Sequence, residues 1–391
     1  LIIYVFLFLT VGTITYDFYN SNNVRIFISK LYSKEQFSPE ETIVKYKDYS
    51  WKLDWPYPPI TLLLLTPAWI SYKYSGGNEF IYQFFYKLPF VLSVLILTLL
   101  IYHQTKSRKL VMEYLFNPGV ILLSLIWGGY DIVNSLLLYL TLIFFQKKQY
   151  YLSFVTLSLS ISLRLYTLII IPFLLLDFIK KRDFKKIIVY LLLSLSFLAL
   201  SLTATHLRNE TVLIKSLISQ NNRYGPLGLY PLISSLRVPL SYFGVGFLDP
   251  KIIAVISITI LVTMEILLFV IVWRKNIALI DSTILSLLIF FLFYPKIHAL
   301  YILVLFPLGL VFKKWRLLKH VWIPGTLYGV LVNGVENVRG IPYWFYWITK
   351  TGFSLQPFLN NILVVLISVS MEALIIYIIF DFLRQKNLTT F

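Results

Sequence analysis

The chain has 391 residues, of which 58% are hydrophobic and 14% are charged, and its mean hydropathy is +0.77. In soluble globular domains about 25% of the residues are charged. This composition excludes an ordinary soluble domain and predicts an integral membrane protein. The formal net charge is +17, but Lys and Arg fall in short clusters between apolar runs, which is typical of topology signals and argues against a nucleic-acid partner.

The sequence also lacks the marks of several enzyme classes. It contains no cysteine, which excludes disulfides, thiol nucleophiles and cysteine metal sites. Neither a GxxxxGKS or GxxxxGKT loop nor a GxGxxG loop occurs. A soluble nucleotide is therefore not the expected substrate.

The first part of the chain joins a short span to a long polar loop. Residues 1–15 form the first apolar run, and residues 16–79 are rich in Asn, Ser, Lys, Glu and Tyr. Within this loop, residues 60–72 are apolar but short, follow a Pro-Pro pair and contain Pro67, which favours a helix in the membrane interface over a full crossing. Because the chain starts at Leu1 and the first run is short, we expect upstream residues and do not interpret the run as a cleaved signal peptide.

The other apolar runs indicate helical spans, because lipid offers backbone polar groups no partners outside a helix. The run at residues 151–178 is too long for one span and carries Arg164 in its middle, which predicts two short helices with a break near that residue. The remaining predicted spans are residues 80–104, 110–127, 132–146, 187–203, 252–273, 277–294, 298–312, 321–334 and 359–383.

The basic clusters predict the topology. If residues 60–72 are interfacial, every short basic cluster falls on one side, as the positive-inside rule requires. We therefore predict an all-α, single-domain protein (1–391) with about twelve transmembrane helices and cytoplasmic termini. The outer face then holds the long loops and the active site, in what we expect to be a prokaryotic cell membrane; these loops are residues 16–79, 204–250 and 335–358.

Asp17 lies where the first span leaves the membrane. A carboxylate in a partly dehydrated space is a stronger base, so Asp17 is the candidate catalytic base for an attacking hydroxyl. The alternative is a solvated acid at a helix end, and Asp48 and Asp54 are rival acids in the same loop. No second acid adjoins Asp17, so the paired carboxylates of a magnesium or manganese site are absent there.

An aromatic corner, Trp55-Pro56-Tyr57-Pro58-Pro59, closes the first loop. Its rigid backbone and large rings suit stacking against a sugar, which makes Trp55 and Tyr57 candidate substrate-positioning residues. The structural alternative is a corner that anchors a re-entrant helix.

Several cationic side chains are candidates for binding an anionic group. Arg164 lies in an apolar run, where an ionised side chain costs roughly 2.5 to 3.5 kcal/mol unless it is paired or hydrated. Lys296 and His298 flank an outer turn, and Arg223 lies in an outer loop beside Gly225 and Pro226, which permit a close turn. A solvated or interfacial position is the alternative for the residues at span ends and in loops.

Glu265 and Glu372 lie deep in apolar runs. Intramembrane carboxylates are typical of proton-coupled transporters, so a transporter or flippase for a lipid-linked or small polar substrate is the alternative function. Pairing with neighbouring helices or snorkelling is the structural explanation. A transporter also predicts broken helices related by a repeat, and the sequence shows no repeat; a non-catalytic membrane subunit is a third interpretation.

The order of these features resembles the GT-C superfamily of polytopic glycosyltransferases, and most of all the polyprenyl-phosphate-mannose-dependent mannosyltransferases. The likeness rests on an Asp after the first span, an outer loop closing on Tyr57-Pro58-Pro59, and the turn Gly128-Gly129-Tyr130-Asp131. This turn is similar to a Gly-Gln-hydrophobic-Asp turn, with Gly129 in place of Gln, and Arg164 stands where Lys is common. Pro295-Lys296-Ile297-His298 is similar to a late outer turn that contains His.

The resemblance implies an inverting transfer without metal or cofactor of a sugar, with mannose favoured, from a polyprenyl-phosphate donor to a lipid-linked or glycan acceptor. Asp17 would act as the base, and Asp131, for which helix capping is the alternative, would help to position the substrate. The departing phosphate would be stabilised by basic side chains, namely His298, Lys296, Arg164 or Arg223. Membrane lipids are further expected partners, and an oligosaccharyltransferase is disfavoured because its paired-acid and Trp-Trp-Asp motifs are missing.

Overall fold

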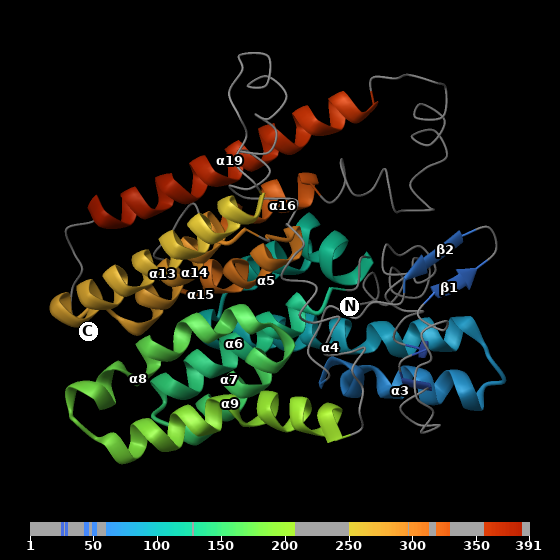
Figure 1. The fold of residues 1–391 in the computed structure, drawn as a ribbon, viewed down its shortest axis with the longest axis horizontal. Helices are drawn as coiled ribbons and strands as arrows, with labels where there is room; N and C mark the ends of the chain where they lie inside the picture. The colour runs from blue at the N-terminus through green and yellow to red at the C-terminus, as the bar shows by residue number, and fades with distance from the viewer. Residues whose placement is uncertain are drawn as a thin grey trace.

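A computed structural model describes residues 25–26, 28–29, 43–46, 49–52, 60–126, 129–207, 250–295, 297–312, 318–328 and 356–384. Most of this part of the chain is helical (Figure 1), which confirms the predicted all-α class at this level. The elements that build the bundle are α3 (Ile60–Tyr74), α4 (Glu79–Thr105), α5 (Arg108–Leu115), η2 (Val120–Ile126), α6 (Asp131–Gln146), α7 (Tyr150–Leu163), η3 (Leu165–Ile170), α8 (Ile171–Lys180), α9 (Phe184–Leu207), α13 (Pro250–Lys275), α14 (Leu279–Phe293), η5 (Ala299–Val304), α15 (Leu305–Phe312), η6 (Leu318–His320), α16 (Trp322–Tyr328) and α19 (Gln356–Arg384).

A two-stranded hairpin lies in the first long loop, for which only helices were predicted. Strand β1 (Ile43–Tyr46) pairs antiparallel with β2 (Tyr49–Lys52). In this register Ile43 lies opposite Lys52, and Tyr46 lies opposite Tyr49.

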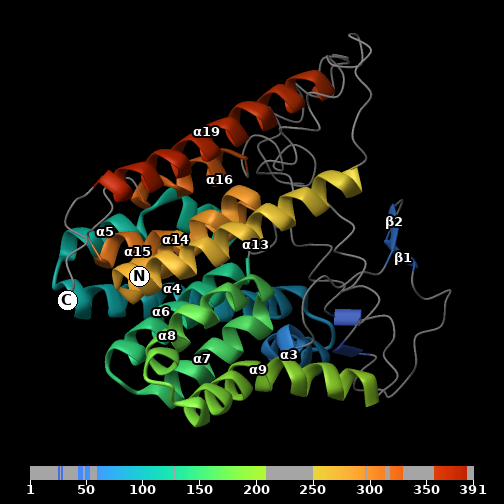
Figure 2. The ribbon, with the colours of Figure 1, turned by 60° about the vertical axis from the view of Figure 1, so that its left-hand side comes forward.

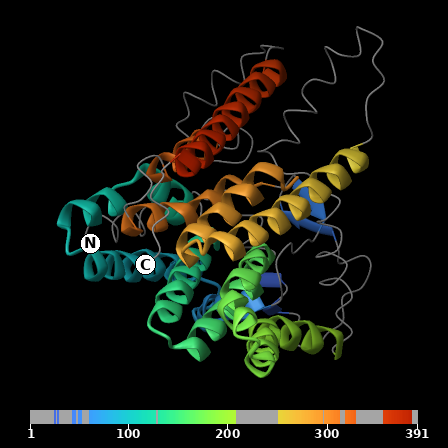
Figure 3. The ribbon, with the colours of Figure 1, turned by 90° about the vertical axis from the view of Figure 1, so that its left-hand side faces the viewer.

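The helices form a bundle in which α9 and α19 lie on opposite sides, with α6 and α14 between them (Figures 1, 2 and 3). Helix α6 packs on α7, which packs on α9, while α14 packs on both α13 and α19. Almost every residue of α14 is buried, as expected for a helix that is apolar on all faces. The core therefore continues from the α6 layer into the α14 layer.

Helices α3 and α4 form a hairpin. Its turn contains Gly76 and Gly77 at φ 67° and 87°, a region that glycine adopts readily. Asn78 then caps α4, because its side chain accepts a hydrogen bond from the Ile81 N–H at 3.2 Å. Residues 60–72, predicted as an interfacial helix, form most of α3, which packs along α4 and also contacts α7 and α9. Its place relative to the membrane stays a prediction.

Within the described residues, four helices are long and apolar enough to cross a membrane, namely Glu79–Thr105, Phe184–Thr203, Ile252–Lys275 and Val365–Phe382. Shorter apolar helices accompany them at Asp131–Gln146, Tyr150–Leu163, Leu279–Phe293 and Leu300–Phe312. This set fits a multi-pass membrane protein, as the composition predicted. The count of about twelve spans also depends on residues outside the described ranges and stays a prediction.

Several apolar runs are interrupted. Arg164 has extended backbone (φ −143°, ψ 108°) between α7 and η3, which confirms the predicted break near this residue. The run at residues 110–127, predicted as a span, is not one continuous helix, because α5 and the π-helix η2 are separate elements. Its crossing of the membrane stays a prediction. Between them, Asn117 Oδ1 accepts hydrogen bonds from the backbone N–H groups two and three residues later, at 2.8 and 3.2 Å. This side chain takes the place of helical acceptors and favours the break.

The interruptions gather around the start of α6. After α14 the backbone becomes extended at Tyr294 and at His298, and the chain resumes as the 3-10 helix η5. Element η5 contacts both α6 and η2, and η3 contacts α7 and α14. Irregular backbone among apolar helices is tolerated where protein buries it or where it lines a cavity. The region where these elements meet, at the start of α6, is therefore the candidate location of a functional site.

Candidate functional site

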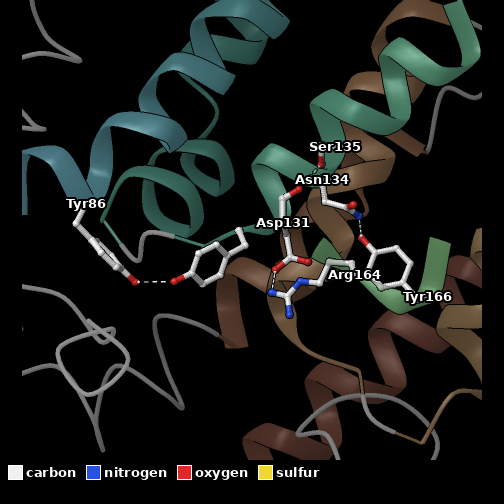
Figure 4. Close-up of polar contacts among 7 residues, drawn as sticks. Tyr86, Asp131, Asn134, Ser135, Arg164 and Tyr166 are labelled. Carbon is white, nitrogen blue, oxygen red and sulfur yellow. Dashed lines mark hydrogen bonds and ion pairs between the residues drawn. The ribbon is translucent and has the colours of Figure 1, made fainter. Parts of the chain in front are cut away.

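A buried ion pair joins the start of α6 to the break after α7. Arg164 Nη2 donates to Asp131 Oδ2 (Figure 4), with the Asp131 side chain fully buried and the Arg164 side chain 8% exposed. Asp131 is the first residue of α6, and the extended backbone of Arg164 ends α7. Each charge would be costly alone in a low-dielectric interior, so each depends on the other. Arg164, which lies in an apolar run, is thus stabilised by pairing with an anion.

The Arg164 guanidinium also lies over an aromatic ring. Its Cζ is 5.1 Å from the ring centroid of Tyr301, within the range of a cation–π interaction. The His298 ring lies edge-on to the same tyrosine, with centroids 5.6 Å apart. His298 and Tyr301 are partly exposed, whereas Arg164 is buried. The accessible side of the cluster is therefore the side that η5 provides.

A chain of polar side chains flanks the ion pair. Asn134 Nδ2 donates to Tyr166 Oη at 2.9 Å (Figure 4). Ser160 Oγ donates to Asn134 Oδ1 at 2.7 Å. The Tyr166 ring contacts Tyr301 at 5.1 Å and Phe290 at 5.3 Å between centroids. These contacts tie α6, α7, η3, α14 and η5 together around Arg164.

Helix α4 supports the turn that carries Asp131. Tyr86 Oη and Tyr130 Oη are 3.3 Å apart, and both side chains are fully buried (Figure 4). The Phe90 ring contacts both edge-to-face, with centroid distances of 5.7 Å to Tyr86 and 5.4 Å to Tyr130. Because Tyr130 directly precedes Asp131, this aromatic group holds the start of α6 against α4.

Gly129, in the same turn, sits where η2 and η5 approach closely. A Cβ at this position would lie 2.9 Å from Leu300 Cδ2 and 3.3 Å from the Leu123 carbonyl oxygen. A side chain there would have to displace Leu300 or the backbone of η2. A glutamine in place of Gly129 would thus need space that Leu300 now fills.

The structure brings together some of the predicted site residues. Asp131, Arg164 and His298 belong to one cluster, although they come from distant parts of the chain. The other predicted site residues lie outside the described residues, and their roles stay predictions; they are Asp17, Trp55, Tyr57, Arg223 and Lys296.

Sequence reasoning missed several members of the cluster. Asn134 follows Asp131 by three positions and Tyr301 follows His298 by three, a spacing that places residues on one side of a helical turn. That spacing was the available signal. Outside this cluster, Lys87 of α4 is 1% exposed. Sequence reasoning could have noticed this lysine in the apolar run at residues 80–104, as it noticed Arg164.

Two carboxyl side chains lie within candidate membrane spans, Glu265 on α13 and Glu372 on α19. Glu265 Oε2 accepts a hydrogen bond from Ser286 Oγ of α14 at 2.9 Å, so Glu265 pairs with a neighbouring helix as expected. Glu372 is 9% exposed. One oxygen of each carboxyl has no hydrogen-bond partner within the described part of the chain. Among the same residues, no group of three or more His, Asp or Glu side chains could hold a metal ion.

Replacing Tyr166 with Phe should lower stability. The Asn134 amide would lose its acceptor in the interior, and a buried donor left without a partner costs about 1–3 kcal/mol. Tyr139→Phe is the matched control, because the Tyr139 hydroxyl is buried and has no partner among the described residues; this change should be neutral or slightly stabilising. Thermal unfolding of both variants in detergent measures the difference. Equal destabilisation would mean that the Tyr166 hydrogen bond contributes nothing.

No protein-family model matches the chain, and no curated protein matches it.

Proposed function

We propose that the protein transfers a sugar, with mannose favoured, from a polyprenyl-phosphate donor to a lipid-linked or glycan acceptor on the outer face of the membrane. The observation that carries the proposal is the convergence of Arg164 and His298 on Tyr301, among interrupted apolar helices. A buried guanidinium beside a partly exposed imidazole suits a phosphate group that arrives within the membrane on its own lipid.

The proposed reaction is a single displacement. The acceptor hydroxyl oxygen attacks the anomeric carbon while the bond from that carbon to the phosphate oxygen breaks, so the configuration inverts. Asp17 accepts the hydroxyl proton, and the polyprenyl phosphate leaves with the electron pair of the broken bond. Arg164 and His298 stabilise the charge that develops on the phosphate.

Other residues have supporting roles in this proposal. Lys296 and Arg223 add positive charge near the phosphate, and Trp55 and Tyr57 stack against the sugar ring. No divalent cation takes part in this scheme, because the basic side chains neutralise the leaving group.

The direct test uses purified protein in lipid nanodiscs. The protein is incubated with radiolabelled polyprenyl-phosphate mannose, or the glucose analogue, together with a membrane lipid extract and EDTA. We expect label to move from one donor into a lipid or glycan product, with the anomeric configuration inverted. Failure of every polyprenyl-phosphate sugar to act as a donor would contradict the proposal.

Replacing His298 with Gln should weaken the use of the donor. Loss of a hydrogen bond to a charged group costs about 1.5–3 kcal/mol, so the KM for the donor should rise by roughly 10- to 150-fold. Initial rates against donor concentration measure the change. His103→Gln is the matched control, because His103 is exposed near the end of α4. An unchanged dependence on donor concentration would assign His298 to packing against Tyr301.

Transport is the second candidate function, and specific observations favour it. Interrupted helices and carboxyl groups within apolar helices are both typical of transporters. Glu265→Gln and Glu372→Gln separate the two functions, because the amide keeps the size of the side chain but cannot carry charge. If the protein is a transferase, both variants should keep sugar transfer. If it is a proton-coupled transporter, both should abolish uptake into proteoliposomes driven by a proton gradient.

A further inference from the structure

We propose that Asp131 occupies, in the free protein, the position on Arg164 that the donor phosphate takes in the complex. This inference rests on the proposed function and concerns the same site. It makes Asp131 an internal anion that keeps the site neutral until the donor arrives.

The contacts around Arg164 divide into two kinds. Asp131 supplies the anion, through Oδ2 on Nη2, and Tyr301 supplies an aromatic face that also meets His298. A carboxylate and a phosphate monoester present the same kind of oxygen acceptor to a guanidinium group. The carboxylate of Asp131 therefore shows where a phosphate oxygen would be held.

Asp131 is only partly satisfied where it lies. Its Oδ1 atom is buried and has no hydrogen-bond partner among the described residues. Buried carboxylates that serve only to hold a fold normally have both oxygens hydrogen-bonded. Because the Asp131 carboxylate is held through one oxygen, another anion could replace it on Arg164.

The carboxylate also has a second favourable position nearby. Asp131 opens α6, and Tyr130, the residue before it, provides no side-chain cap for this helix. Acidic side chains in the first turn of a helix are stabilised by the helix dipole. A rotation of the Asp131 side chain within the first turn of α6 would release Arg164 while the carboxylate kept this stabilisation.

This arrangement predicts the sign of an affinity change. Neutralising Asp131 leaves the buried Arg164 charge without its anion, so a phosphate that enters supplies the missing charge and binds more tightly. If Asp131 instead served to orient Arg164 toward the donor, its neutralisation would weaken binding. A purely structural Asp131 would change stability and leave affinity alone.

The experiment measures binding of farnesyl phosphate, with farnesol as the uncharged control, by calorimetry on the full chain in detergent. Asp131→Asn should tighten binding of farnesyl phosphate by about tenfold and leave farnesol unchanged. Asp131→Ser tests the same change with a smaller side chain, in case the Asn variant folds poorly. Asp281→Asn is the matched control, because Asp281 is also buried in the first turn of a helix, α14. Adding Arg164→Gln to Asp131→Asn should remove the gain.

Each outcome decides the inference. Equal or weaker binding of farnesyl phosphate by both Asp131 variants, with the wild-type protein still binding it, would overturn the inference and leave the proposed function standing. Failure of every form, including the wild-type protein, to bind farnesyl phosphate would overturn both. A gain that survives Arg164→Gln would also overturn the inference, because the added affinity would come from elsewhere.

Discussion

Replacing Arg164 with Met will destabilise the protein by about 3–5 kcal/mol and abolish sugar transfer. The substitution keeps a long apolar side chain but leaves the fully buried Asp131 carboxylate without its cation. Breaking a buried ion pair by removing one partner costs this much because the remaining charge stays desolvated. Thermal and denaturant unfolding in detergent, followed by tryptophan fluorescence, measure the loss.

Two control variants test whether the loss of stability comes from breaking the Asp131–Arg164 ion pair. Arg182→Met removes an exposed arginine at the end of α8, and its effect on unfolding should be close to zero. The double variant Arg164→Met with Asp131→Asn removes both charges, so it should recover much of the lost stability but not sugar transfer. A double variant as unstable as the single one would show that Arg164 stabilises the fold through contacts other than the Asp131 pair.

Replacing Asp17 with Asn will reduce sugar transfer by about 10²- to 10⁴-fold, because the amide keeps the size of the side chain but cannot accept a proton from the acceptor. Binding of the donor and thermal stability should stay unchanged. Single-turnover transfer from radiolabelled polyprenyl-phosphate sugar, measured beside a donor-binding assay, distinguishes the loss of chemistry from the loss of binding.

Asp48→Asn and Asp54→Asn are the matched controls, since both acids belong to the same loop as Asp17. They should transfer sugar at close to the wild-type rate. Full activity of the Asp17 variant, together with a large loss in one of the others, would move the base to that residue and keep the reaction type. Full activity of all of them would remove a loop carboxylate from the mechanism.

Much of the fold could be predicted from local patterns. The run at residues 80–104 matches α4 closely, and the break at Arg164 followed from placing a charge within an apolar run. The interruption of the run at residues 110–127 was not predicted, because hydropathy averages over a window. It cannot register that Asn117 would bond to the amides of the following residues and separate η2 from α5.

The site was predicted residue by residue but not as an arrangement. Arg164 and His298 were each identified as candidate phosphate ligands, because cations near apolar runs need a reason to be there. Their common neighbour Tyr301 was missed, since a tyrosine in an aromatic-rich membrane chain carries no distinguishing signal. Asp131 was assigned to substrate positioning, and its contact with Arg164 joins residues from separate helices, which no local pattern can indicate.

The sequence by itself determined that this is a helical protein fitted to a membrane, because the solvent preference of each segment depends only on its own side chains. It also indicated the break near Arg164, where a charged residue interrupts an apolar run. Only the tertiary structure decided that the break at Arg164 faces the start of α6 and the turn before η5, because the pairing of Asp131, Arg164 and Tyr301 depends on how distant helices pack. The burial of Asp131 and Arg164 turns two isolated charges into one interdependent pair, and this dependence is what the proposed binding of a phosphate would exploit.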